Sequence, residues 1–194
     1  MTKRIGITGG IGTGKSTVGQ ILQNLGYPVI DADDVVHQAL AGNTTVQEAL
    51  RQHFGDGVFD AETGKPSRPA LAKRIFQNEA DKLFLEGLLH PLVREEIKRF
   101  FQKHEGQSLA FALVPLLFES GLEVFYDEVW CVATSPDVQI ARLKASRGMS
   151  DELIHARVAN QWSLEEKIKR SQRVLWNDGS VEDLKAQVHE TLGS

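Results

Sequence analysis

The sequence predicts an α/β fold: a five-stranded, mostly parallel sheet flanked by helices, with a helical insert and a small lid. Two observations lead to this prediction. Short apolar runs alternate along the chain with helical patterns, which is typical of parallel sheets. The central runs are apolar throughout, as expected for strands that helices cover on both faces. The expected strands cover residues 4–8, 28–31, 108–114, 129–134 and 173–176.

The first strand and the helix after it enclose a complete G-x-x-x-x-G-K-S motif at residues 9–16, the pattern of a phosphate-binding loop. Ile5 and Ile7 form the β run before the loop, and apolar residues recur at helical spacing after it. Glycine allows backbone turns that point successive N–H groups at phosphate oxygens. The alternative is a turn that only joins two elements, but the intact motif in this setting favours a nucleoside triphosphate site.

Residues 15–17 carry side chains suited to a triphosphate and its metal ion. Lys15 is expected to reach the β- and γ-phosphates, and Thr17 to donate a hydrogen bond to the α-phosphate. The hydroxyl of Ser16 is placed where Mg²⁺ would lie between the phosphates, which makes Ser16 the predicted metal ligand.

Carboxylates follow the second strand, in the run Asp31-Ala32-Asp33-Asp34. In a sheet with a phosphate loop, the end of this strand can face the γ-phosphate, where a carboxylate could orient an attacking hydroxyl and accept its proton. If the backbone stays extended, Asp31 and Asp33 point to the same side. The alternative is that Asp33 or Asp34 caps the next helix, and position alone leaves both roles open.

Two regions do not read as simple crossovers between strands. Residues 61–105 show only helical patterns, interrupted at His90-Pro91, and form the expected helical substrate-binding insert. Residues 143–170 begin with basic residues and a glycine, continue into a helix start at Ser150, and form the expected lid. The core then comprises residues 1–60, 106–142 and 171–194. Further helix starts are expected at Ser135, Ser163 and Ser180.

Five short motifs resemble those of the dephospho-coenzyme A kinase family. They are GITGGIGTGKST at residues 6–17, DAD at 31–33, HPLVR at 90–94, VPLLFE at 114–119 and NDG at 177–179, so the similarity covers nearly the whole chain. The resemblance implies a phosphotransferase with a P-loop kinase core. Its reaction would be transfer of the γ-phosphoryl of ATP, with Mg²⁺, to the ribose 3′-hydroxyl of dephospho-coenzyme A, the last step of coenzyme A synthesis.

The same resemblance assigns roles to individual positions. It implies that Asp33 is the general base and that Lys15 and Arg142 also act in catalysis. It implies that ATP contacts Gly12, Thr13, Gly14, Lys15, Ser16, Thr17, Arg147 and Asn177. It implies that the acceptor contacts Asp31, Asp33, His90, Arg94, Leu117 and Glu119.

Several of these assignments have a structural alternative. Arg142 and Arg147 would neutralise charge on the transferring phosphoryl group, since guanidinium presents a planar fork to oxyanions, or they form only an exposed basic helix face. His90 contacts the acceptor, or it caps a helix that Pro91 begins. Glu119 reaches the acceptor or a metal-bound water, or it is only a polar residue at a strand end.

The end of the third strand departs from a common pattern. Many phosphate-loop enzymes place an aspartate there for Mg²⁺, but Ala112-Leu113-Val114 supplies no carboxylate. The metal would then depend on Ser16, the phosphates, water, and Asp33 or Glu119.

Composition fits a compact enzyme with small-molecule substrates. The 194 residues carry a net charge of −4, which argues against nucleic-acid binding or a membrane-surface protein, and no stretch is long enough to span a bilayer. Cys131, the single cysteine, lies in an apolar run, which suits a reducing cytoplasm. We therefore expect a cytoplasmic monomer or weak homo-oligomer whose partners are ATP and dephospho-coenzyme A.

Other functions share some of these features. Another small phosphate-loop kinase, for a nucleoside monophosphate, shikimate or gluconate, remains an alternative because the loop alone does not choose the acceptor. A nucleotide-dependent switch such as a small GTPase would need Asn-Lys-x-Asp and Asp-x-x-Gly motifs, which the sequence lacks. A regulatory module that binds ATP without turnover would need a degraded base or acceptor pocket, and the sequence shows no sign of one.

Overall fold

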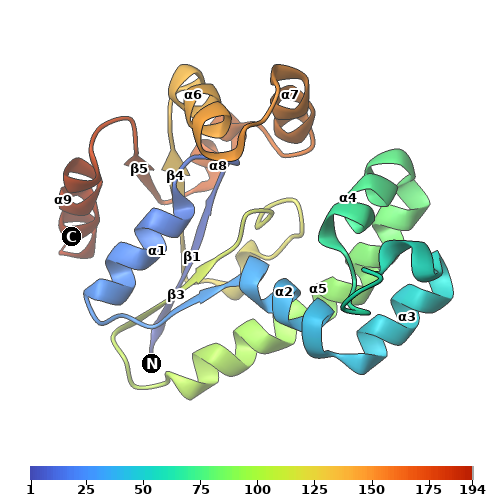
Figure 1. Ribbon diagram of the computed structural model, residues 1–194. Helices are drawn as coiled ribbons and strands as arrows, with labels where there is room; N and C mark the ends of the chain where they lie inside the picture. The colour runs from blue at the N-terminus through green and yellow to red at the C-terminus, as the bar shows by residue number, and fades with distance from the viewer. Residues whose placement is uncertain (194) are drawn as a thin grey trace. The chain divides into compact units, whose positions relative to one another are not determined.

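The computed structural model describes residues 1–193, and of Arg147 it describes the backbone only (Figure 1). The chain divides into two compact units. The first unit comprises Met1–Asp31 together with the chain from Phe101 onward, and the second comprises Ala32–Phe100. The first unit holds the sheet, and the second is mainly helical.

The sheet of the first unit has five strands, and each neighbouring pair is parallel (Figure 1). The order is β2-β3-β1-β4-β5, so the strand that leads into the phosphate loop lies at the centre. This confirms the predicted fold class. The strands are β1 Lys3–Gly9, β2 Val29–Asp31, β3 Leu109–Leu113, β4 Glu128–Ala133 and β5 Arg173–Trp176.

The first unit contains helices in addition to the sheet. They are α1 Lys15–Asn24, α6 Pro136–Arg147, α7 Asp151–Ala159, α8 Leu164–Arg170 and α9 Val181–Leu192. Helices α1 and α9 contact each other, and α8 contacts β1 and β4. Phe111 and Trp130 are the largest apolar side chains of this core, and their rings meet edge to face at 5.4 Å. Burying one such side chain contributes about 1.5–3 kcal/mol.

The expected serine caps lie at the starts of these helices. Ser150, Ser163 and Ser180 each accept a hydrogen bond from the backbone N–H three residues later, and so satisfy a donor that the helix leaves unpaired. Asp183 also accepts from the backbone N–H of Ser180, which completes a capping box. Ser135 precedes Pro136 at the start of α6 but makes no side-chain cap.

The second unit begins at Ala32, earlier than the insert boundary expected at residue 61. The reason is its own apolar core, in which Leu40 of α2 and Leu50 of α3 join Leu71 of α4 and Leu89 of α5. These two early helices therefore belong with the later ones. The helices are α2 Ala32–Gly42, α3 Thr44–Phe54, α4 Arg68–Gln77 and α5 Glu79–Lys103.

Helix α5 is continuous where the sequence predicted an interruption. Pro91 lies inside the helix, so the predicted interruption was wrong, and the alternative in which His90 caps a helix that begins at Pro91 is excluded. Proline removes one backbone donor from the helix interior at a cost of about 3 kcal/mol. Apolar side chains on both sides of Pro91, including Leu89 and Val93, are buried, and this packing favours the unbroken helix.

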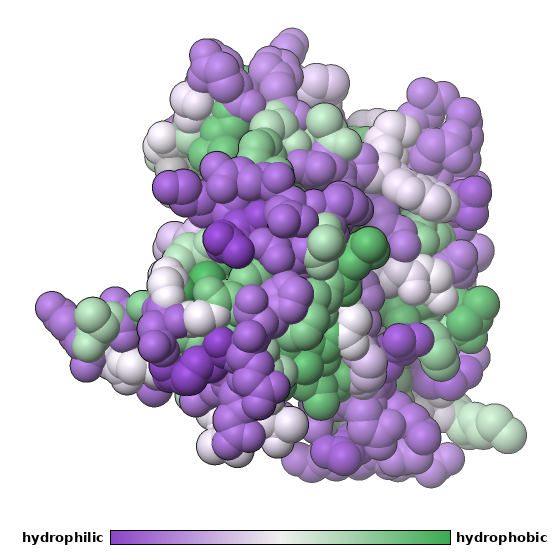
Figure 2. All heavy atoms as spheres, turned by 90° about the vertical axis from the view of Figure 1, so that its right-hand side faces the viewer, coloured by the Kyte–Doolittle hydropathy of each residue, from purple (hydrophilic) through white to green (hydrophobic). Residues whose placement is uncertain are grey.

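The surface carries polar side chains over most of the face shown in Figure 2, with separate apolar areas between them. Phe76 and Leu83 of the second unit and Val124 of the first are among the exposed large apolar residues. Scattered apolar residues of this kind are ordinary on folded proteins.

Candidate active site

The carboxyl ends of the strands bring together the segments in which the sequence predicted chemistry. Gly9 ends β1 and begins the phosphate loop, and Asp31 ends β2. The segment from Val114 follows β3, Thr134 follows β4, and Asn177 follows β5. Open α/β sheets bind ligands at this edge, because connecting loops there leave a crevice beyond the strands.

The phosphate loop has a backbone that requires glycine at two of its positions. Gly12 and Gly14 have φ values of 76° and 98°, in the left-handed region that side-chain-bearing residues avoid. A Cβ atom at Gly12 would lie 2.9 Å from Cγ of Leu143, and one at Gly14 would collide with Nδ2 of Asn177. The loop is therefore a close-packed cradle, and its backbone leads directly into the N-terminus of α1.

Lys15 begins α1 and folds back over this loop. Its Nζ donates hydrogen bonds to the carbonyl oxygens of Gly9 at 3.0 Å and Gly10 at 3.2 Å. The first turn of α1 contains no acidic residue, so no negative side chain there opposes an anion at the helix N-terminus. Ser16 lies in the same turn and is exposed.

Asn177 supports the loop from the end of β5. Its Nδ2 donates to the carbonyl oxygen of Thr13 at 2.8 Å, and its backbone N–H donates to Ala133 at 2.8 Å. The residue is only 7% exposed. Asn177 thus fixes the loop conformation from behind, while its predicted contact with ATP stays a prediction.

Asp178 joins the ends of β4 and β5. It accepts hydrogen bonds from the Thr134 hydroxyl at 2.6 Å and from the Ser135 backbone N–H at 2.7 Å. These hydrogen bonds, helped by the positive charge of Arg142, hold the pKa of the Asp178 carboxyl below its usual range. Arg142 of α6 therefore lies within electrostatic reach of the strand ends.

The tip of the phosphate loop is held by residues that sequence reasoning missed. Gln139 of α6 donates from Nε2 to the carbonyl oxygen of Ile11 at 2.7 Å, and Gln161 accepts from the Ile11 backbone N–H at 3.1 Å. The Ile11 side chain packs on an apolar cluster that includes Leu143 of α6 and Ile154 of α7. Helices of the predicted lid region thus contact the loop directly. The side chain of Arg147, a predicted ATP contact, lies outside the described part of the structure.

The segment after β3 is also built into the first unit. The side chain of Leu117 is fully buried and packs so closely on β1 that a Cβ atom at Gly6 would lie 2.6 Å from its Cδ1. Leu117 therefore supports the segment from inside, and its predicted contact with the acceptor stays a prediction. Glu119 forms an ion pair with Lys167 of α8 at 2.8 Å, a partner that the sequence did not indicate.

The other predicted substrate residues belong to the second unit. Asp33 and Asp34 lie exposed in the first turn of α2, which begins at Ala32. The extended backbone considered for Asp31 to Asp33 therefore ends at Asp31. His90 and Arg94 lie one turn apart on α5, and Nε of Arg94 donates to the carbonyl oxygen of His90 at 3.4 Å.

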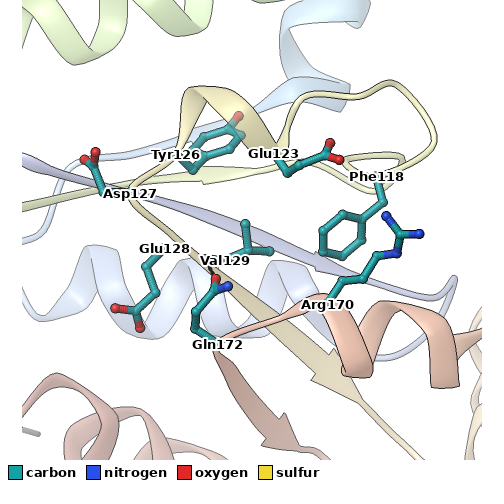
Figure 3. Close-up of a pocket in the computed structure, with 8 residues that line it drawn as sticks. All are labelled: Phe118, Glu123, Tyr126, Asp127, Glu128, Val129, Arg170 and Gln172. Atoms are coloured by element: carbon teal, nitrogen blue, oxygen red, sulfur yellow. Dashed lines mark hydrogen bonds between the residues drawn. The ribbon is translucent and has the colours of Figure 1, made fainter.

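A pocket of about 340 Å³ lies elsewhere in the first unit, where β4 begins (Figure 3). Its walls include Glu123, Tyr126, Arg170 and Gln172. Asp127 and Gln172 immediately precede β4 and β5, so the pocket lies at the amino ends of these strands. The phosphate loop lies at their carboxyl ends, and the pocket is not part of the candidate active site.

Comparison with known proteins decides the family. The family described as dephospho-CoA kinase matches residues 3–183. The chain belongs to the dephospho-CoA kinase family. A dephospho-CoA kinase from Gloeobacter violaceus is 40% identical over 188 residues, which are 97% of this chain and 90% of the relative.

Solved structures agree with this membership. A protein from Thermus thermophilus has a TM-score of 0.85 at 36% identity, covering 99% of this chain and 97% of that one. A dephospho-CoA kinase from Campylobacter jejuni has a TM-score of 0.72 at 28% identity, covering 100% and 96%. The protein is thus a dephospho-CoA kinase, an ATP-dependent phosphotransferase of coenzyme A biosynthesis, as the sequence predicted.

Within residues 1–193, no cluster of three or more His, Cys, Asp and Glu side chains is arranged to hold a metal ion. In the same part of the chain, every helix is too short or too polar to cross a membrane.

Gly14→Ala is expected to weaken ATP binding and lower the melting temperature. The left-handed backbone costs alanine roughly 1–2 kcal/mol, and the new Cβ would also collide with Asn177. Titration calorimetry and thermal melting measure the two effects. Gly26→Ala is the matched control, because Gly26 has a φ of 86° but no atom within 4 Å of an added Cβ. Equal ATP affinity in both variants would show that the packed cradle does not bind the nucleotide.

Proposed function

We propose that the loop from Gly12 to Thr17 binds the triphosphate of ATP and that Asp33 aligns and deprotonates the acceptor hydroxyl. The observation that supports the first part is the cradle itself. Its left-handed glycines, the N-terminus of α1 and the Lys15 ammonium converge at the end of the central strand. Backbone N–H groups and a cation in this arrangement suit phosphate oxygens.

The proposed role of Asp33 rests on its position in the chain. It lies two residues beyond Asp31, the end of β2, and in the first turn of α2. A general base must reach the proton that it removes, and a carboxylate just beyond the sheet edge is suited to an acceptor hydroxyl that attacks the γ-phosphate. Asp31 would contact the acceptor from the strand end.

Mg²⁺ fits the donor set at the start of α1. Ser16 has an exposed hydroxyl next to Lys15, and phosphate oxygens and water would supply the other ligands that this oxygen-seeking ion prefers. The bound ion would neutralise charge on the phosphates. Glu119 is a candidate for a water-mediated contact, since its Oε2 is buried and has no hydrogen-bond partner among the described residues.

Arg147 within the lid and Arg142 next to it are the proposed cations that act on the phosphates. Their guanidinium groups would stabilise the phosphoryl group during transfer. Closure of the segment from 143 to 170 would exclude water, which otherwise competes with the acceptor for the γ-phosphate. The contact of Gln161 with Ile11 supports this role, because it joins the lid region to the phosphate loop.

Four further residues are proposed to contact the acceptor. His90 and Arg94 on α5 offer a ring and a cation for the anionic dephospho-coenzyme A, and Leu117 and Glu119 belong to the segment that follows β3. We further propose that the enzyme works in the cytoplasm as a monomer or weak homo-oligomer. Its buried free thiol at Cys131 suits a reducing compartment.

The acceptor atom is tested with dephospho-coenzyme A that lacks the ribose 3′-hydroxyl. This 3′-deoxy analogue is expected to compete with dephospho-coenzyme A but to receive no phosphate, because the proposed nucleophile is missing. Mass spectrometry and ³¹P NMR of the products measure both properties. Phosphorylation of the analogue would place the reaction at a different hydroxyl and would remove the proposed role of Asp33 with it.

A further inference from the structure

Lys167 is a buried charge that the reaction described above does not use. Its side chain is 0% exposed, which is rare for lysine unless the ammonium is paired. Nζ donates to the Pro115 carbonyl oxygen at 2.8 Å and forms the ion pair with Oε1 of Glu119 at 2.8 Å. A buried ion pair often adds little stability over an apolar pair of the same size, so its presence suggests a role in geometry.

Both partners of Lys167 lie in the segment from Pro115 to Glu119, and each is held by a second contact. The Pro115 carbonyl oxygen also accepts from the hydroxyl of Thr8, one residue before the phosphate loop motif, at 3.2 Å. Oε1 of Glu119 also accepts from the backbone N–H of Trp162 at 2.9 Å. The two oxygens that Lys167 contacts are therefore also bonded to β1 and to the chain that leads into α8.

The residue before Trp162 reaches the phosphate loop. Gln161 accepts from the backbone N–H of Ile11, so consecutive residues contact the loop tip and Glu119. The Trp162 ring is itself fixed, because it stacks on Phe118 at 6.2 Å and lies 4.5 Å from the Arg170 guanidinium carbon. Phe118 and Arg170 also line the pocket of Figure 3, from the loop and from α8.

Lys167 and Lys15 also act electrostatically on the same side chain of the sheet. The thiol of Cys131 in β4 has a pKa raised to about 11 by burial, and the positive charges of Lys167 and Lys15 both oppose that rise. The two ammonium groups therefore act on the same buried atom of the sheet. Lys167 itself has no exposed surface, so it is suited to holding neighbouring groups and not to contacting ATP.

We propose that Lys167 is a positioning residue that fixes the segment from Pro115 to Glu119 relative to the phosphate loop. The inference rests on the proposed function in one respect, namely that this segment faces the acceptor. Phosphoryl transfer depends on in-line alignment of acceptor and γ-phosphate, and a displacement of about 1 Å can cost roughly a hundredfold in rate. Loss of the Lys167 contacts then lowers turnover because the acceptor is no longer aligned with the γ-phosphate.

The test compares Lys167→Met, Glu119→Gln and the double variant by steady-state kinetics, ATP titration and thermal melting. Lys167→Met is expected to lower kcat by about tenfold or more, while the Kd for ATP stays within about twofold. The double variant is expected to recover melting temperature, because no unpaired charge remains and glutamine still accepts from Trp162. The kcat of the double variant is expected to stay as low as that of Lys167→Met, since both changes remove the same ion pair.

The matched control is Lys169→Met, the same change at an exposed lysine of α8. It is expected to keep wild-type kcat and ATP affinity. A double variant with wild-type kcat would make the ion pair a stability feature only and would overturn the proposal, even if Lys167→Met alone does not fold. Failure of the proposed function gives a different result, because wild-type enzyme would then form no 3′-phosphorylated product.

Discussion

Asp33→Asn is expected to lower turnover by about a hundredfold or more while leaving ATP affinity nearly unchanged. Asparagine has almost the shape of aspartate but cannot accept a proton, and general-base catalysis contributes roughly 10²–10⁴-fold. Asp33 lies in the first turn of α2, outside the loop proposed to bind the phosphates, so the change leaves that loop intact. Single-turnover measurements of coenzyme A formation and titration with ATP separate the two quantities.

Asp34→Asn is the matched control for this prediction. Asp34 is exposed in the same helical turn, so both variants lose one favourable charge at the N-terminus of α2, a contribution of about 0.3–1 kcal/mol. Turnover of Asp34→Asn is expected to stay near wild type. If Asp33→Asn also turned over at the wild-type rate, Asp33 would be only a helix-terminal residue and another group would serve as the base.

Lys15→Ala is expected to weaken ATP binding and to lower turnover by about 10²–10³-fold, the effect of removing one well-placed charge-stabilising donor. Lys15 is held over the loop by the carbonyl oxygens of Gly9 and Gly10, so its ammonium is preorganised beside the cradle. The loss therefore affects both bound ATP and the transferring phosphoryl group. Fluorescence titration with a nucleotide analogue and steady-state kinetics measure the two effects.

Lys185→Ala removes the same charge at an exposed position of α9 and serves as the control. Binding and turnover are expected to be unchanged in it. Wild-type kinetics in Lys15→Ala would mean that the phosphates bind somewhere other than this loop, and the proposed geometry would have to be abandoned.

The strands and the phosphate loop were predictable because their signals are local. An apolar run, a glycine motif and apolar residues at helical spacing each lie within a short stretch of sequence. Only the order of the strands in the sheet was needed to bring the ends of these segments together. The caps at Ser150 and Ser180 are local for the same reason. Membership of the dephospho-CoA kinase family was likewise predictable from short motifs that span nearly the whole chain.

The contacts that shape the site were less predictable because they join distant residues. Asn177 supports Thr13 across 164 positions, and Lys167 reaches Pro115 across 52. In the sequence, Lys167 is one of several charged residues in a short helix and carries no sign that it is buried. The start of the second unit at Ala32 depends on packing of Leu40 and Leu50 with later helices, which local patterns do not reveal.

The most direct test of the central claim is product formation from Mg²⁺-ATP with a panel of acceptors: dephospho-coenzyme A, AMP, CMP, shikimate and gluconate. ADP and phosphorylated product are quantified for each one. We expect coenzyme A to form in step with ADP, with little activity on the other acceptors. Turnover of another acceptor beside silence on dephospho-coenzyme A would contradict the assigned specificity, while leaving phosphoryl transfer at the loop in place.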